Sequence, residues 1–151
     1  MWQSLAKDLD ALLDDSDHPI TTLANASALL FQRIERINWL GFYLYDGSKL
    51  YLGPFTGKPA CTTIEMGKGV CGTAAEKREI IVVDDVDKFP GHIACDPDSR
   101  SEIVLPLVLS DGRLFGVFDI DSAELARFGD EEKEGLQQIA VILQRKIFLP
   151  Q

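Results

Sequence analysis

The chain has 151 residues, 46% of them hydrophobic, and carries a formal net charge of −9 at pH 7. This size and apolar content predict one domain, residues 1–151, around a single core. The acidic balance disfavours nucleic acids and anionic membranes as partners, because both are bound through clustered Lys and Arg. No apolar run has the roughly 18 residues of a membrane span, and the acidic N-terminus lacks the basic start of a secretory signal. We therefore expect a cytoplasmic protein.

Hydrophobic periodicity predicts two helices at the start of the chain. Trp2, Leu5 and Leu9 follow helical spacing, and the polar run at residues 14–18 ends that segment. Apolar residues then recur at helical intervals through residues 20–38, among several alanines. We expect a second helix there, ending near Asn38.

From residue 39 the period changes to two. Trp39 and Tyr43 fall on one face of a predicted strand at residues 39–45, and the other face is aliphatic. We expect the aliphatic face in the core. An Asp-Gly pair then predicts a hairpin into a strand at residues 50–52.

The middle of the chain is rich in loops. The glycine-rich residues 67–72 read as a loop before a short helix at residues 73–77, and a β-branched run follows at residues 80–83. Residues 84–100 form a long loop. Loops of this length in compact domains are usually functional or disordered.

The last third of the chain predicts a hairpin and a helix. Strands at residues 102–109 and 114–120 are joined at an Asp-Gly turn, and a final amphipathic helix begins at an N-cap candidate, Asp130. Helices at both ends with consecutive strands between them predict an α+β fold with a mainly antiparallel sheet.

The register of this last hairpin gathers acidic residues. If the turn has two residues, Glu102 lies opposite Asp121, and Asp119 lies on the same face. A three-residue loop with a bulge would break this prediction. Opposed like charges destabilise a sheet, so the cluster indicates a cation, a shared proton or a polar ligand. The alternative is a solvated edge, which the apolar Val104 and Phe115 on the same face make less favourable.

The three cysteines, Cys61, Cys71 and Cys95, are an odd number for a disulfide framework. Each can be a small buried hydrophobic residue or a reactive thiol. Cys95 is the stronger candidate for reactivity, because it lies in the long loop near His92. Zinc binding by the three cysteines and His92 is not favoured, since the spacing lacks a C-x-x-C pair. We therefore predict no metal site.

Trp39 and Tyr43 have two interpretations that the residues alone leave open. They can pack under a loop, as aromatic side chains commonly do. They can also form an apolar wall for the side chain of a small ligand, because the other face of their strand already supplies the core.

Five segments carry the most specific pattern of the chain: NWLGFYLYDG at residues 38–47, LGPFTGKPAC at 52–61, GKGVCGTAA at 67–75, FPGHIACDPDSRSEIVLPL at 89–107 and GVFDIDS at 116–122. They span most of the chain and include all three cysteines. In combination they resemble the free methionine-(R)-sulfoxide reductases, which are GAF-domain enzymes.

This resemblance implies a GAF-like fold, with a six-stranded, mainly antiparallel sheet flanked by N- and C-terminal helices, usually in a homodimer. It implies Cys95 as the nucleophile, with Cys61 and Cys71 as resolving thiols. It also implies that Trp39 and Tyr43 enclose the methionine side chain. The substrate-binding carboxylates that it implies are Glu102, Asp119 and Asp121.

The implied activity is reduction of free L-methionine-(R)-sulfoxide to L-methionine. Cys95 would take the oxygen as a sulfenic acid, which condenses with a second thiol to an intramolecular disulfide. Cys61 is the preferred partner, with Cys71 as the alternative. Thioredoxin would then reduce the disulfide. No metal or organic cofactor is expected.

The three acids would have separate roles in proton transfer and in substrate binding. Asp119 or Asp121 would hold the proton for the departing oxygen, and Glu102 would bind the substrate's ammonium group. The main alternative function is a GAF module that senses a small molecule without catalysis. A purely structural dimerisation module would explain the terminal helices but not the carboxylates.

Overall fold

The computed structural model describes residues 1–92 and 95–147. Within these residues the helices are α1 (Trp2–Leu12), α2 (Pro19–Arg33), α3 (Gly69–Lys77) and α4 (Asp130–Lys146), with a 3-10 turn, η1, at Val86–Lys88. The strands are β1 (Trp39–Tyr45), β2 (Lys49–Thr56), β3 (Thr63–Glu65), β4 (Ile81–Val83), β5 (Ser101–Val108) and β6 (Leu114–Ser122). In this described part, no helix combines the length and the apolar character needed to cross a membrane.

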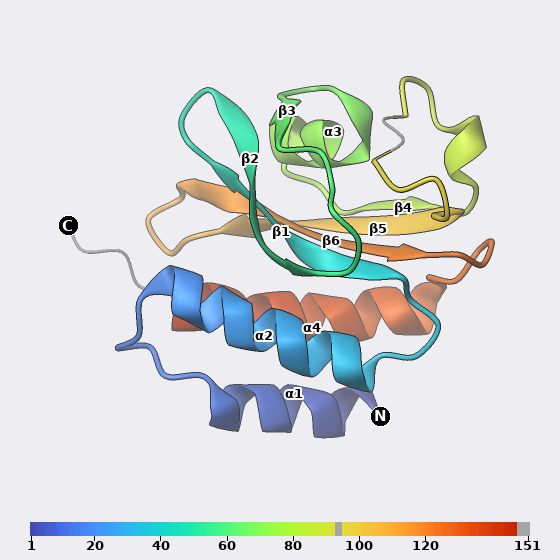
Figure 1. The fold of residues 1–151 in the computed structure, drawn as a ribbon. Coiled ribbons are helices and arrows are strands. Elements are labelled where there is room, and N and C mark those ends of the chain that lie inside the picture. Colours follow the sequence, from blue (N-terminus) through green and yellow to red (C-terminus); the bar gives the residue numbers. More distant parts are fainter. Residues whose placement is uncertain (93–94, 148–151) are drawn as a thin grey trace.

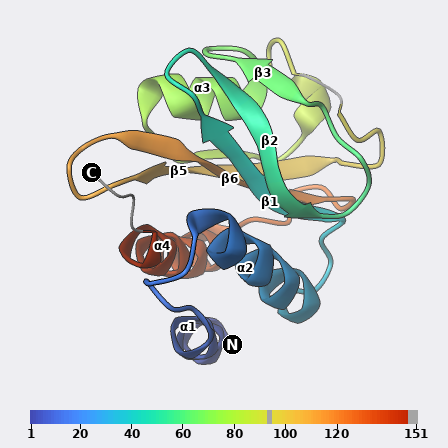
Figure 2. The ribbon, with the colours of Figure 1, turned by 60° about the vertical axis from the view of Figure 1, so that its left-hand side comes forward.

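The strands form one antiparallel sheet in the order β3-β2-β1-β6-β5-β4. Helices α2 and α4 cover one face, with α1 lying beyond them, and α3 covers part of the other face (Figures 1 and 2). The expected α+β fold is therefore confirmed, with a six-stranded sheet and helices from both ends of the chain packed against it.

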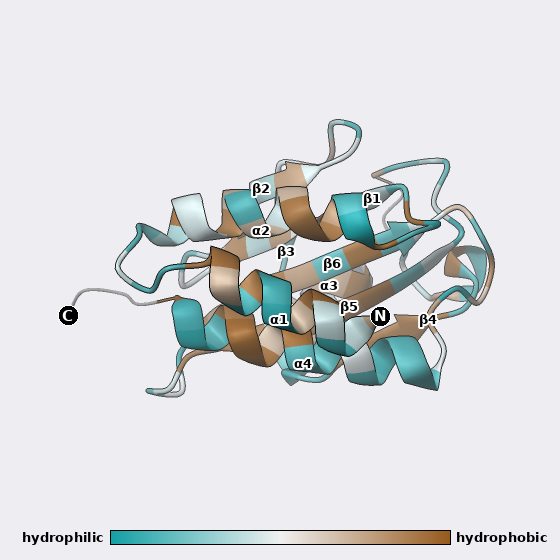
Figure 3. Ribbon diagram, turned by 90° about the horizontal axis from the view of Figure 1, so that it is seen from below, coloured by the Kyte–Doolittle hydropathy of each residue, from teal (hydrophilic) through white to brown (hydrophobic). Residues whose placement is uncertain are grey.

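Each face of the sheet has its own hydrophobic core. Leu40 and Phe42 of β1 pack beneath the terminal helices, whose hydrophobic residues alternate with hydrophilic ones along α1, α2 and α4 (Figure 3). Trp39 and Tyr43, on the other face of the same strand, pack with residues of α3. The alternation predicted for β1 is confirmed, and both of its faces are buried.

Helix α2 ends at Arg33 rather than near Asn38. The backbone becomes extended at Ile34, and Arg36 adopts a left-handed conformation with φ of 60°. Ile34 is nevertheless buried, and Ile37 packs against the same core. The apolar residues of this extended connection therefore have the spacing of a helix, which explains why the sequence predicted a longer α2.

Three other elements differ from the prediction. Helix α3 begins at Gly69, so Cys71 lies in its first turn instead of in a loop. Strand β2 continues to Thr56, beyond the predicted end at residue 52. Pro54 does not end the strand, because it lies at the bulge where the register with β1 shifts, and a bulge tolerates proline. The N-cap of α4 is Gly129 rather than Asp130. The short β3 and η1 were not predicted, since three residues give too little periodicity.

The loop of the last hairpin is longer than the predicted two-residue turn. It spans residues 110–112, and Leu109 N donates to Arg113 O across it (2.9 Å). The predicted pairing of Leu109 with Leu114 is therefore wrong, because Val108 pairs with Leu114.

A bulge then restores the register, so the expectation that a three-residue loop with a bulge would break the carboxylate cluster is wrong. Leu107 pairs with Gly116, which leaves Phe115 as an extra residue on β6. Glu102 consequently lies opposite Asp121, as predicted. Phe115, however, packs against the core on the helix side instead of lying on the carboxylate face.

Candidate active site

All of the predicted site residues except Cys61 line one cavity of about 40 Å³. Trp39 and Tyr43 reach it from β1, Cys71 reaches it from α3, and Cys95 reaches it from the segment before β5. Cys61 does not line the cavity, but it is bonded to Cys95. The carboxylates of β5 and β6 complete the lining, namely Glu102, Asp119 and Asp121.

Cys61 and Cys95 form a disulfide across a sequence separation of 34 residues, with their Cα atoms 5.4 Å apart. Both residues are partly exposed. A disulfide at a partly exposed position is open to attack by an external thiolate. In this form neither sulfur is available as a metal ligand, so the four-residue zinc set considered from the sequence is not assembled.

Cys71 is a free and buried thiol. Burial raises its pKa well above the ordinary value, and the nearby Asp119 and Glu102 raise it further. A thiol in this setting stays protonated at neutral pH and is a poor nucleophile. Cys71 therefore differs sharply in chemistry from the two bonded cysteines.

The three carboxylates are all buried, with Glu102 7% exposed, Asp119 5% and Asp121 8%. Burial is the largest cause that raises each pKa well above its usual range, and repulsion between the neighbouring acids adds to it. Asp119 Oδ1 is buried and has no hydrogen-bond partner. The cluster therefore retains protons at pH values where ordinary carboxyls are ionised.

Among the described residues, His92 is the one basic side chain within ion-pair range of this cluster, with Nε2 3.7 Å from Glu102 Oε1. Burial lowers the pKa of His92, and this effect outweighs the negative charge of Asp87, which raises it. The imidazole is then largely neutral at pH 7, so the carboxylates lack a compensating charge.

The aromatic residues of β1 form one wall. Trp39 and Tyr43 are each 2% exposed, and their rings lie 6.0 Å apart. Their polar atoms hold the segment that follows β2: Trp39 Nε1 donates to Lys58 O (3.0 Å), and Tyr43 Oη donates to Cys61 O (2.9 Å). The rings therefore pack under a loop, as the first interpretation holds, and they also line the cavity, whereas their contact with a ligand side chain stays a prediction.

This set of residues can be compared with known proteins. The GAF domain family matches residues 9–146. The free methionine-R-sulfoxide reductase of Escherichia coli is 48% identical over 144 residues, covering 95% of this chain and 87% of the relative. The enzyme of that name from Saccharomyces cerevisiae is 42% identical over 150 residues, covering 95% and 83%. The chain belongs to the free methionine-R-sulfoxide reductase family.

Solved structures of free methionine-R-sulfoxide reductases have the same fold. The reduced form of fRMsr from Staphylococcus aureus gives a TM-score of 0.93 at 47% identity, covering 97% of this chain and 95% of that one. The Neisseria meningitidis enzyme, solved in complex with its substrate, gives 0.88 at 41% identity, covering 96% and 87%.

In this member of the reductase family, polar contacts join the two cysteine-bearing segments to the sheet. Asn38 Nδ2 donates to Asp96 Oδ2 (3.0 Å) and to Ser99 Oγ (3.1 Å). Lys58 forms an ion pair with Asp98. These contacts fix the segment after Cys95 against the start of β1 and the end of the loop before Cys61.

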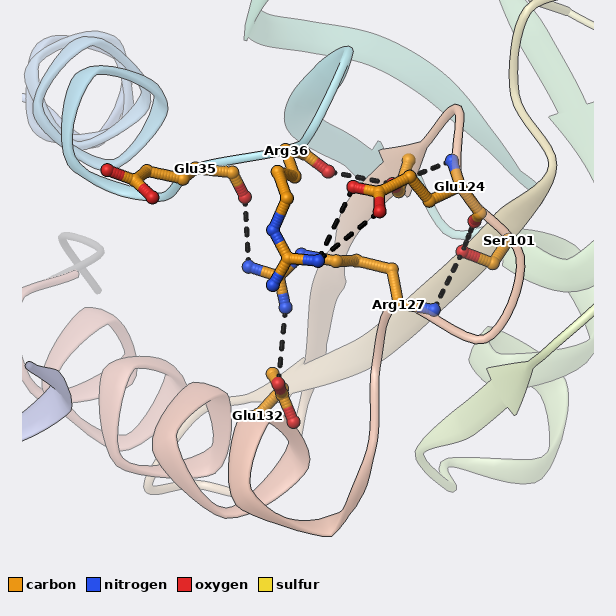
Figure 4. A network of polar contacts seen from close by, with 7 residues as sticks. Glu35, Arg36, Ser101, Glu124, Arg127 and Glu132 are labelled. Carbon is orange, nitrogen blue, oxygen red and sulfur yellow. Dashed lines mark hydrogen bonds and ion pairs between the residues drawn. The ribbon is translucent and has the colours of Figure 1, made fainter.

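A second polar network supports the strand ends behind the carboxylates (Figure 4). Arg127 Nη2 donates to Glu35 O (2.9 Å), and its Nη1 pairs with Glu132 (3.2 Å). Its backbone N donates to Ser101 Oγ (3.3 Å), and that hydroxyl donates to Glu124 O (2.6 Å). The network therefore ties together the chain after α2, the start of β5 and the start of α4.

Sequence reasoning missed Asp96, Asn38 and Arg127 as parts of the site or its support. Asp96 was visible only as a neighbour of Cys95, but it is 8% exposed and lines the cavity. Arg127 could not have been found from the sequence, because its burial and its hydrogen bond to Ser101 appear only in the structure.

Proposed function

We propose that this protein reduces free L-methionine-(R)-sulfoxide to L-methionine through the thiols of Cys95 and Cys61. The observation that carries the proposal is their disulfide beside a cavity lined by buried carboxylates and two aromatic rings. The names of the Escherichia coli and Saccharomyces cerevisiae relatives support the same reaction.

In the first step the thiolate of reduced Cys95 attacks the sulfoxide sulfur. The oxygen passes to Cys95 as a sulfenic acid, and methionine leaves, so the substrate sulfur gains the two electrons that Cys95 loses. The departing oxygen needs a proton. Asp119 or Asp121 supplies it, because burial raises the pKa of both carboxyls well above the usual range and keeps a proton on the pair.

In the second step the thiol of Cys61 attacks the sulfenic acid of Cys95. A disulfide forms and water is released. The observed bond between these residues supports Cys61 as the resolving thiol. Cys71 is disfavoured, because burial raises the pKa of its thiol.

Thioredoxin then restores the dithiol. Its thiolate attacks the partly exposed disulfide, and exchange leaves Cys61 and Cys95 reduced and thioredoxin oxidised. No metal or organic cofactor takes part in this cycle.

The cavity chemistry explains a preference for the free amino acid. Glu102 binds the substrate's ammonium group, which a peptide-bound residue lacks, and Trp39 and Tyr43 enclose the thioether chain.

The test supplies thioredoxin, thioredoxin reductase and NADPH together with each epimer of free methionine sulfoxide in turn. We expect NADPH consumption and methionine formation with the R epimer and neither with the S epimer. Folded, reduced protein that binds the R epimer without forming methionine would instead support the ligand-sensing function.

A further inference from the structure

Three donor atoms from three different secondary-structure elements converge in the cavity. They are Cys71 Sγ from α3, a Glu102 carboxylate oxygen from β5 and an Asp119 carboxylate oxygen from β6, and all lie within 4.8 Å of one another. All three residues are buried, at 4%, 7% and 5% exposure. One thiolate with two carboxylates is a donor set for zinc-class cations, since sulfur excludes magnesium and calcium as preferred occupants.

A second observation points to a missing partner inside this group. Asp119 Oδ1 is buried and accepts no hydrogen bond from an N–H or hydroxyl group, and the polar neighbours of its carboxyl are the other acids and the Cys71 thiol, so either a shared proton or a cation must balance it. Among residues 1–92 and 95–147, no Lys or Arg forms an ion pair with Glu102 or Asp119. Buried carboxylate oxygens are ordinarily paired, hydrogen-bonded or bound to a metal.

We propose that the disulfide form binds one thiophilic divalent cation, of the zinc class, between Cys71, Glu102 and Asp119. The cavity of about 40 Å³ has room for an ion with a coordinated water. A shift of about 1 Å brings the donors to tetrahedral spacing, given metal–ligand bonds of about 2.0–2.3 Å. Water completes the coordination.

Binding involves no redox change. The Cys71 S–H bond breaks and a sulfur–metal bond forms, and the thiol proton passes to solvent together with any proton that Glu102 and Asp119 hold. The donor set differs from the zinc set considered from the sequence, because it uses the one cysteine that stays outside the disulfide. If the proposed catalysis holds, the cation and the substrate ammonium compete for the same carboxylates, but cation binding itself does not depend on that function.

The test titrates Cd²⁺ into the disulfide form and follows the ultraviolet charge-transfer band of a cadmium thiolate. The chain has three cysteines; since Cys61 and Cys95 are bonded to each other, any such band reports Cys71 alone. We expect saturation at one Cd²⁺ per chain and displacement by Zn²⁺. Cys71→Ala should remove the band, and Glu102→Gln and Asp119→Asn should each weaken binding by at least about tenfold.

Asp111→Asn is the matched control, because Asp111 is an exposed acid that pairs with Arg113, and its removal should leave Cd²⁺ affinity unchanged. Absence of the band in folded wild-type protein overturns the proposal. A band that is insensitive to both Glu102→Gln and Asp119→Asn also overturns it, because the thiol would then bind alone. Methionine formation, measured separately in chelator-containing buffer, distinguishes this failure from failure of the proposed reductase function.

Discussion

At the scale of single residues, position divides the three cysteines into two kinds. Cys61 and Cys95 are partly exposed and bonded, whereas Cys71 is buried in the first turn of α3. Burial and nearby acids keep Cys71 protonated. The chemistry proposed for the pair therefore cannot be transferred to the third thiol.

Cysteine substitutions should separate the two proposed steps. Cys95→Ser should abolish methionine release, because the hydroxyl is far less nucleophilic than a thiolate. Cys61→Ser should release one equivalent per chain and stop at a sulfenic acid, which a sulfenic-acid reagent would trap. Rapid quenching with quantification of methionine measures both outcomes.

Cys71→Ser serves as the comparison and should still turn over repeatedly with thioredoxin. If Cys71→Ser stopped after one equivalent while Cys61→Ser continued, the roles assigned to these two thiols would be reversed.

At the scale of elements, periodicity predicted the principal helices and strands, and it predicted which face of β1 carries Trp39 and Tyr43. It failed at α2, because Ile34 and Ile37 are buried from extended chain. It also could not show that Tyr43 Oη binds Cys61 O, because that contact joins residues whose separation is set by tertiary packing. Family resemblance named the site residues, but the cavity's size and the burial of its acids required coordinates.

The network around Arg127 is an element-scale support that can be tested. Arg127→Met should lower the free energy of unfolding by about 2 kcal/mol, because it leaves Glu35 O and Glu132 without a buried donor. Arg127→Lys should not restore stability, since one ammonium cannot reproduce the two-directional guanidinium contacts. Urea denaturation measures both changes.

The matched control is Arg33→Met, which removes a more exposed ion pair with Asp8 (2.7 Å). Arg33→Met should lower the free energy of unfolding by no more than about 1 kcal/mol. Equal losses for Arg127→Met and Arg33→Met would show that the buried network adds no support.

At the scale of the whole molecule, the buried acids should make stability depend on pH. Burial and mutual repulsion raise the pKa values of Glu102, Asp119 and Asp121 in the folded protein above their unfolded values. The folded state then binds more protons than the unfolded state. Their contribution to stability is thus greatest below about pH 4 and falls as the pH rises above it.

Above about pH 5 we expect each extra proton that the folded state retains to lower the free energy of unfolding by about 1.4 kcal/mol per pH unit. Asp119→Asn and Glu102→Gln should flatten this slope in chelator-containing buffer. Asp111→Asn should not, because the Arg113 backbone N–H lowers the pKa of that exposed carboxyl. Denaturant midpoints across the pH range measure the slopes, and an unchanged slope in both buried variants contradicts the expectation.

The loop at residues 110–112 and the extra residue Phe115 link the far end of the last hairpin to the chemistry of the cavity. Successive residues of a strand point to opposite sides of the sheet, so the side of a residue depends on whether its number of positions from the turn is odd or even. We call this odd or even count the parity of the strand. Because β1 also holds β6 in place, removing one residue from the loop alone would reverse the parity of β5 only, and Glu102 would leave the face that carries Asp119 and Asp121. We therefore expect a one-residue deletion at this distant turn to break up the carboxylate cluster unless loss of the bulge compensates for it.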